Sequence, residues 1–231
     1  MIRSALSMTK TTPLAARGMV VAEHPLGAEV GAAILARGGN AVDAAVATAF
    51  AMPVVEPFMS TLAGGGSFLI HLERRGETVA IDANVEAPAA CHERSYTLGE
   101  GVSDDLFPWR RVVDDANVFG PQAVAVPGSV AGLCLTLERY GTMELADVLA
   151  PAIRLADEGF VPDWYVSLTT ALYTQELSAF PETASTYLRG GRHVYRPPAL
   201  AEGDLLRQPE LASGSSPRMG RRPSTAAPSP R

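Results

Sequence analysis

The sequence predicts a mixed α/β (α+β) protein, and three observations lead to that prediction. Alanine and glycine are abundant while aromatic residues make up 6 % of the 231 residues, which is typical of closely packed helices with small side chains. Apolar residues recur at helical spacing in several segments between residues 26 and 158. Two short apolar runs, Ser67–Leu72 and Thr78–Asp82, flank a charged turn and favour a β-hairpin. A chain of this length can form one core, so we expect one domain.

The first expected elements lie between residues 19 and 52. The apolar run at 19–22 predicts a strand, and the spacing over 26–37 predicts a helix. Asn40 is then well placed as an N-cap, with the Asp43 carboxylate in the first turn of the next helix. That helix, 41–52, is apolar on nearly every side, so we expect it to be buried all round.

A turn region connects this helix to the hairpin. Pro53 is expected to end the helix, and three glycines, Gly64–Gly66, precede the first strand. A phosphate-binding loop needs a Lys and a following helix, and neither is present. We therefore interpret the glycines as allowing close backbone packing at a strand entrance. A stand-alone ligand-binding module that uses these glycines is an alternative hypothesis.

Beyond the hairpin the pattern predicts an irregular loop and then helices. Residues 97–120 have the polar, Gly- and Pro-containing composition of a solvated loop. Residues 122–126 predict a short strand, Ser129 is expected to cap a helix that ends at Tyr140, and 144–158 predict a helical stretch that restarts at Pro151. Weaker helical signals continue to residue 188. We assign no chemistry to the acidic residues of the loop, which are Asp104, Asp105, Asp114 and Asp115.

Charge and cysteine content exclude several classes of function. The formal net charge of −6 argues against a nucleic-acid partner. No apolar run is long enough for a secretion signal or a membrane span, so we expect no membrane association and a cytoplasmic location. Cys91 and Cys134 have neither disulfide-framework nor zinc-site spacing, and we interpret the neighbouring Cys91 and His92 as a coincidence. We expect no metal and no cofactor.

The composition divides the chain into three parts. Residues 1–18 are expected to be a flexible N-terminus and residues 19–212 the folded domain. Residues 213–231 are rich in Ser, Pro, Arg, Ala and Gly and have no hydrophobic periodicity, so we expect a disordered tail. Such a composition often results from reading GC-rich DNA in the wrong frame, and one hypothesis is that the tail is frameshifted.

Four segments, taken in order, resemble the γ-glutamyltranspeptidase family of N-terminal-nucleophile hydrolases. Weaker matches continue to Ala212, so the resemblance covers residues 19–212 and identifies them as similar to the large subunit of that family. The four segments are Val21–Leu26, Gly38–Ala47, Val54–Pro57 with Gly64–Gly66, and Val124–Leu133.

The resemblance implies a fold and a chemistry. The fold is a four-layer αββα sandwich, of which this chain would supply the large-subunit half. The family cleaves one precursor into two subunits, and a Thr at the new N-terminus of the small subunit attacks a γ-glutamyl amide such as that of glutathione. This chain resembles the large subunit alone. We therefore expect no catalytic residue here, no activity without a small-subunit partner, and an isolated chain that aggregates or partly unfolds.

One position of the resemblance concerns the substrate. Family members have an Arg that binds the glutamyl α-carboxylate two positions after a strand ending in Ile-Asp, and here Asn84 follows Ile81 and Asp82 in its place. A neutral amide lacks the charge and the two-pronged geometry of Arg, and Glu86 adds a nearby negative charge. Asn84 is thus the candidate substrate-binding residue. An acylase with a non-glutamyl substrate and a non-functional orphan fragment are the alternative hypotheses.

Overall fold

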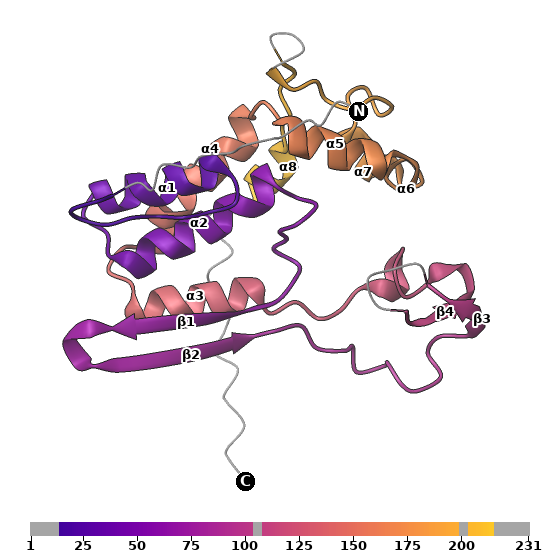
Figure 1. Ribbon diagram of the computed structural model, residues 1–231, viewed down its shortest axis with the longest axis horizontal. Coiled ribbons are helices and arrows are strands. Elements are labelled where there is room, and N and C mark those ends of the chain that lie inside the picture. The colour runs from indigo at the N-terminus through magenta and orange to yellow at the C-terminus, as the bar shows by residue number, and fades with distance from the viewer. Residues whose placement is uncertain (1–13, 104–107, 199–202, 215–231) are drawn as a thin grey trace, which may run out of the picture.

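The computed structural model describes residues 14–103, 108–198 and 203–214. Helices form a body, a two-stranded hairpin with one helix along it lies on one side of that body, and an extended segment leaves the hairpin (Figure 1). We call residues 85–126 the arm. None of the described helices is long and apolar enough to cross a membrane.

Helix α2 forms the centre of the body because its sequence offers few polar side chains. Val46, Ala47 and Ala51 are at most 1 % exposed. Small side chains at these positions let the neighbouring helices approach closely, and the apolar surface removed from water stabilises the packing. The central helix and the two helices that pack most extensively on it are α2 (Ala41–Val55), α1 (Pro25–Ala36) and α4 (Leu145–Glu158).

The predicted hairpin is confirmed. Its strands are β1 (Gly66–Leu72) and β2 (Glu77–Ala83), which run antiparallel with Gly66 opposite Ala83. Helix α3 (Ser129–Tyr140) lies along the hairpin (Figure 1). Gly132 of α3 approaches the side chains of Ala83 and Phe68 so closely that a Cβ there would overlap them. This contact joins the middle of the chain to the end of β2.

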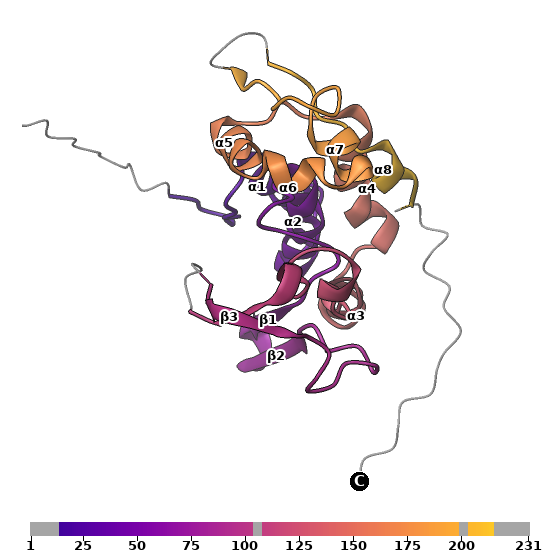
Figure 2. The ribbon, with the colours of Figure 1, turned by 90° about the vertical axis from the view of Figure 1, so that its right-hand side faces the viewer.

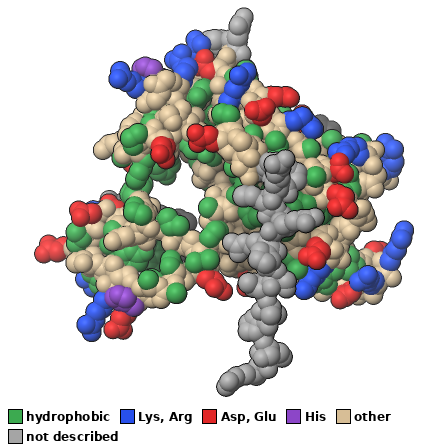
Figure 3. All heavy atoms as spheres, turned by 180° about the vertical axis from the view of Figure 1, so that it is seen from behind, with side chains coloured by type: hydrophobic (Ala, Val, Ile, Leu, Met, Phe, Trp, Pro, Cys, Tyr) green, Lys and Arg blue, Asp and Glu red, His purple; other side chains and the backbone are tan. Residues whose placement is uncertain are grey.

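The arm contains more regular structure than the predicted irregular loop. Strands β3 (Leu98–Val102) and β4 (Arg110–Val112) pair antiparallel, and short 3-10 helices follow at Val113–Asp115 and Pro121–Ala123. None of the described residues from 84 to 131 is buried. Figure 3 shows this part as a separate lobe with an opening between it and the helical body. Asp114 and Asp115 are exposed, as predicted, while Asp104 and Asp105 lie outside the described residues.

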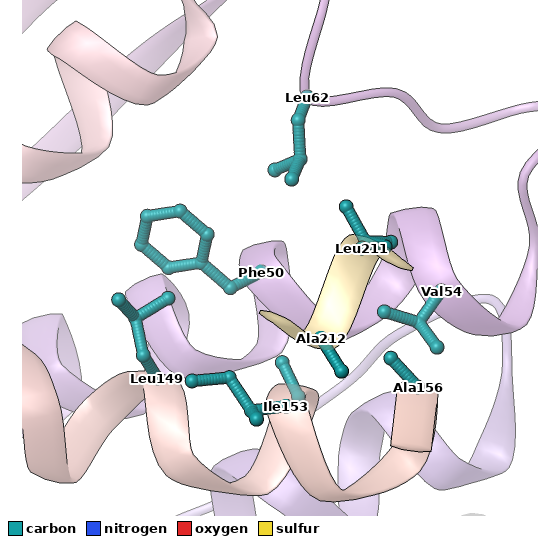
Figure 4. Close-up of a pocket in the computed structure, with 9 residues that line it drawn as sticks. Phe50, Val54, Leu62, Leu149, Ile153, Ala156, Leu211 and Ala212 are labelled. Carbon is teal, nitrogen blue, oxygen red and sulfur yellow. The ribbon is translucent and has the colours of Figure 1, made fainter. Parts of the chain in front are cut away.

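The remaining helices close the other end of the body. Helices α5, α6 and α7 gather on the side away from the hairpin (Figure 2). Helix α8 returns to α2 and α4, and its Leu211 and Ala212 help to enclose an apolar cavity of about 20 Å³ (Figure 4). All the side chains that line this cavity are apolar. The bounds are α5 (Trp164–Leu172), α6 (Thr174–Ser178), α7 (Pro181–Tyr187) and α8 (Pro209–Gly214).

Gln208 anchors this last helix to the centre of the fold. The side chain is 4 % exposed, and its amide Nε2 donates a 2.8 Å hydrogen bond to the carbonyl oxygen of Val54 in the last turn of α2. Its backbone N–H donates to the carbonyl of Ala156 at 2.7 Å. The segment that carries the weakest part of the family resemblance is therefore part of the packed structure.

Two proline predictions are wrong. Helix α2 continues through Pro53 to Val55, and α4 runs without interruption through Pro151. Both prolines are buried, so the packing of their rings offsets the hydrogen bond that each proline removes from its helix. The expected complete burial of 41–52 is also too strong, because Ala41 and Ala45 are exposed.

Three further local predictions need correction. Residues 19–22 form no strand, since the described structure places no partner strand beside them. Residues 122–126 contain a 3-10 helix and an isolated bridge between Val126 and Glu86 in place of a strand. Ser129 is the first residue of α3 and makes no side-chain cap, while Gly128 holds the N-cap position.

The predicted domain boundaries fall near the limits of the described residues. Of the expected flexible N-terminus, residues 1–13 lie outside the described part of the chain, as do residues 215–231 of the expected disordered tail. Helix α8 includes Ser213 and Gly214, two residues beyond the predicted end of the domain.

Candidate substrate site

Three segments that are far apart in the sequence meet at the open end of the hairpin. The carbonyl oxygen of Gly64, before β1, accepts hydrogen bonds of 3.0 Å from the backbone N–H groups of both Gly128 and Ser129, before and at the start of α3. The segment after β2 lies against the other two. The glycine turn, the Asn84 segment and the Pro127-Gly128 turn thus form one site.

Glycine is required at two of these positions because backbones approach each other closely there. A Cβ on Gly65 would lie 2.5 Å from the Val85 nitrogen and 2.7 Å from Asn84 backbone carbons. A Cβ on Gly128 would overlap the carbonyl oxygen of Ala83 and lie 2.6 Å from that of Asn84. Both distances are far below van der Waals contact, so the predicted packing role is confirmed for Gly65, whereas a Cβ on Gly66 would meet open space.

Asn84 is held in place by the aspartate two residues earlier. The Asp82 Oδ1 atom accepts hydrogen bonds from the Asn84 backbone N–H at 3.1 Å and from the side-chain Nδ2 at 2.7 Å. Both side chains are exposed. One of the two side-chain N–H donors of Asn84 is therefore occupied, while its Oδ1 and the Asp82 Oδ2 accept no hydrogen bond within the described structure. The sequence reasoning missed Asp82, although an Asp two residues before a turn residue is a known hydrogen-bonding pattern.

The surroundings of Asn84 are acidic and apolar. The three converging segments, residues 56–73, 76–93 and 112–138, contain no Arg or Lys. The Glu86 carboxylate is exposed two residues beyond Asn84, and its backbone pairs with Val126 at 2.8 and 3.1 Å. Val85, Val126 and Val130 are 43–49 % exposed beside these groups. The site can therefore accept hydrogen bonds and contact apolar atoms, but it offers no cation to a carboxylate.

The other candidate groups do not join this site. Cys91 is exposed, and the His92 Nδ1 accepts a hydrogen bond of 3.1 Å from the Arg94 backbone and not from Cys91. Burial raises the pKa of the Cys134 thiol, with Glu138 as a second cause, so it is a poor nucleophile. Within the described residues, no three His, Cys, Asp or Glu side chains gather in a way that could hold a metal ion.

The predicted capping box at the start of α2 has a larger role than sequence reasoning assigned to it. Asp43 is 0 % exposed, and its Oδ2 accepts from the Asn40 backbone at 2.7 Å. Its two oxygens also accept from the Thr142 backbone and hydroxyl at 2.8 and 2.6 Å and from the Met143 backbone at 3.1 Å. Burial by itself raises the pKa of this carboxyl, but the hydrogen bonds outweigh it and the pKa lies below its usual value. Asp43 therefore joins α2 to the loop after α3.

A second buried carboxyl lies at the other end of α2 without such partners. Glu56 is 2 % exposed and its Oε2 makes no hydrogen bond to the described protein. Burial raises its pKa, and the nearby carboxylates of Glu23 and Asp163 raise it further. The neighbouring His24 is also buried, and burial lowers its pKa although Asp163 and Glu29 oppose the shift. This cluster lies away from Asn84 and faces the start of α1 and α5.

Comparison with known proteins decides the family. A family model for γ-glutamyltranspeptidase matches residues 27–214. The chain belongs to the γ-glutamyltranspeptidase family. The acylase ACY 1 proenzyme of Pseudomonas sp. (strain SE83) is 41 % identical over 201 residues, which are 87 % of this chain and 35 % of that protein. The glutathione hydrolase proenzyme of Bacillus subtilis (strain 168) is 35 % identical over 198 residues, which are 84 % of this chain and 31 % of that protein.

Solved structures place the chain in the same family fold. The γ-glutamyltranspeptidase of Helicobacter pylori is 32 % identical and superposes with a TM-score of 0.75 over 88 % of this chain and 54 % of that one. The cephalosporin acylase of Bacillus halodurans, at 24 % identity and a TM-score of 0.64 over 91 % of this chain and 38 % of that one, shares the fold. This chain covers part of the γ-glutamyltranspeptidase fold and spans about a third of the length of the curated relatives.

Proposed function

We propose that this chain is the large-subunit side of an amidase or acyltransferase of the γ-glutamyltranspeptidase family, and that it needs a partner segment to act. The nucleophilic Thr expected from the family resemblance has no counterpart in the described site, which offers acceptors and apolar contacts but no activated nucleophile. In this proposal the partner supplies the nucleophile, and this chain positions the acyl group. The relatives that it matches are proenzymes of which the matched residues make up about a third, which supports a role for further chain.

The substrate proposal rests on one observation, the neutral Asn84 held by Asp82 in a site without a cation. A substrate carboxylate bound beside Asn84 would meet acceptor oxygens and the negative charge of Glu86. The free-energy cost of removing that carboxylate from water would then have no compensating interaction. An uncharged acyl group with an apolar portion would instead contact Val85, Val126 and Val130. We therefore infer hydrolysis or transfer of a non-glutamyl amide. The 41 % identity to a protein named as an acylase supports this choice over glutathione.

The experiment co-expresses this chain with the small subunit of a family member and compares two 4-nitroanilides, one γ-glutamyl and one with an uncharged acyl chain. The expected result is hydrolysis of the uncharged substrate by the complex and none by this chain alone. Asn84→Arg should raise kcat/KM for the γ-glutamyl substrate by about tenfold, because a charge-assisted bidentate pair replaces repulsion. Asn84→Gln is the matched control and should leave the preference unchanged.

Each outcome bears on a separate part of the proposal. Hydrolysis by the chain alone would contradict the need for a partner. A wild-type complex that prefers the γ-glutamyl substrate, with Asn84→Arg having no effect, would contradict the substrate assignment. A folded complex that hydrolyses neither anilide would favour the alternative that the chain is a non-functional fragment.

A further inference from the structure

The closed end of the hairpin, away from Asn84, forms a second hollow of about 490 Å³. It is lined by the turn between β1 and β2, by the first turn of α2 and by the last turn of α3. Seven residues of extended strand separate the two ends of β1, about 20 Å at the usual rise per residue, so this hollow and the Asn84 site are distinct. Its volume is in the range of small-molecule sites.

The charge of this hollow is opposite to that of the chain as a whole. Arg74 and Arg75 line it from the 3-10 turn Glu73–Arg75, and Arg139 lines it from α3. The one carboxylate among the lining residues is that of Glu73, which is already bonded to the His71 imidazole at 3.0 Å. Within the described structure none of the three arginines makes an ion pair or a hydrogen bond. The chain carries a formal charge of −6, so this surplus of positive charge is local.

Ordinary structural roles account for part of this arrangement. Arg139 lies in the last turn of α3, where a cation interacts favourably with the helix dipole. The first turn of α2 contributes little extra attraction for an anion, because Asn40 already bonds the Val42 and Asp43 N–H groups and the Asp43 carboxylate offsets the dipole. Neither role explains two adjacent arginines on the hairpin turn that line the same hollow. The inference therefore rests on the three guanidinium groups and the concave shape.

We propose that this hollow binds a small phosphate-bearing polyanion, with Arg74, Arg75 and Arg139 as its ligands. Guanidinium groups match the oxygens of phosphate with paired hydrogen bonds, and groups from two separate elements can grip two phosphates at once. A small ligand is favoured over an acidic protein surface because the three arginines line one hollow of about 490 Å³. The proposal is independent of the amidase activity assigned to the Asn84 site.

The test is a titration of the purified 231-residue chain with inorganic pyrophosphate at low ionic strength, followed by calorimetry. Arg74→Gln with Arg75→Gln is expected to weaken binding at least tenfold, and Arg139→Gln about fivefold, because each loses charge-assisted hydrogen bonds. Arg154→Gln is the matched control, since Arg154 is exposed on α4, does not line the hollow and should leave binding within twofold. Circular dichroism on each variant verifies that it is folded.

The outcomes separate the proposal from its rivals. Equal binding of pyrophosphate by all three variants, or no binding of pyrophosphate by the folded wild-type chain, would overturn it. Preference for an oligoglutamate peptide over pyrophosphate would also overturn it and indicate an acidic protein partner. If the double Gln variant is unfolded, the double variant Arg74→Lys with Arg75→Lys replaces it, because it keeps both charges. Binding of pyrophosphate by this Lys variant within tenfold of wild type, together with weaker binding by Arg139→Gln, would support the site.

Discussion

The body around α2 and the arm, residues 85–126, bury their side chains to very different degrees. Phe50 in α2 is 5 % exposed, whereas Phe119 in the arm is 42 % exposed and Trp109 is 65 % exposed. Hydrogen bonds in the body join residues as far apart as Val54 and Gln208. Within the arm, the Tyr96 hydroxyl donates a hydrogen bond to the Gln122 carbonyl, which belongs to the same segment.

This difference bears on the candidate substrate site. Asn84, Val85 and Val126 lie where the arm joins the hairpin, so one side of the site is fixed by the packed body and the other by a segment without a core. Segments with few buried contacts open locally at low free-energy cost. The body should therefore hold its shape more firmly than the arm, and the arm should need an additional surface to be held as firmly. Four substitutions test this comparison.

The largest expected contrast is between the two phenylalanines. Phe50→Ala should lower the free energy of unfolding by about 3–5 kcal/mol, because it removes a buried ring from the core and leaves a cavity. Phe119→Ala should change it by less than about 0.5 kcal/mol, since the ring is exposed. Urea unfolding followed by circular dichroism measures both. Equal losses would show that the arm shares the core of the body.

Asp43→Ala should lower the free energy of unfolding by about 3 kcal/mol at pH 7, because the N–H groups of Asn40, Thr142 and Met143 lose a buried acceptor. The folded pKa of Asp43 lies below its value of 3.8 in the unfolded chain, so its contribution is complete well above pH 3.8 and is lost as the pH falls through the folded pKa. Thermal melts between pH 2 and 7 measure it. Asp147→Ala, which removes an exposed surface ion pair, is the control. If Asp43→Ala were as stable as Asp147→Ala, the role of Asp43 as a buried acceptor would be contradicted.

Gln208→Ala should lower the free energy of unfolding by about 2 kcal/mol, because the Val54 carbonyl in the interior loses its donor and α8 loses its anchor. Gln122→Ala in the arm is a matched control, because the side chain of Gln122 is exposed and the substitution keeps the backbone carbonyl that the Tyr96 hydroxyl bonds. The control should leave stability within about 0.5 kcal/mol. Denaturant melts of the two variants measure both effects. If Gln208→Ala leaves the free energy of unfolding unchanged, α8 does not unfold cooperatively with the rest of the protein.

The smallest expected effect is a gain. Glu56→Gln should raise the free energy of unfolding by about 1 kcal/mol at pH 7, because it removes a buried charge that has two carboxylates nearby. The folded pKa of Glu56 is above its usual 4.5, so the wild-type protein loses stability as the pH rises from 4.5 through the folded pKa, and the variant should not. Glu77→Gln, at an exposed position, is the control. A loss of stability at pH 7 would mean that Glu56 has a favourable partner.

The sequence by itself determined the local elements and their order. The capping box of Asn40 and Asp43, the central helix and the hairpin follow from short-range patterns of polarity, and those patterns are physical constraints on neighbouring residues. The family resemblance, which rests on motifs in a fixed order, was confirmed by the family match. The position of Asn84 after Asp82 was also readable, although its role is a proposal.

Tertiary structure decided what depends on distant partners. Pro53 and Pro151 remain inside helices because packing against other elements offsets their lost hydrogen bonds, which no local rule foresees. Thr142 and Met143 reach Asp43 across about a hundred residues of sequence, and Gly64, Asn84 and Gly128 meet in one site from three segments. Such contacts depend on how complete elements pack, since their energies belong to pairs of residues that are neighbours in space alone.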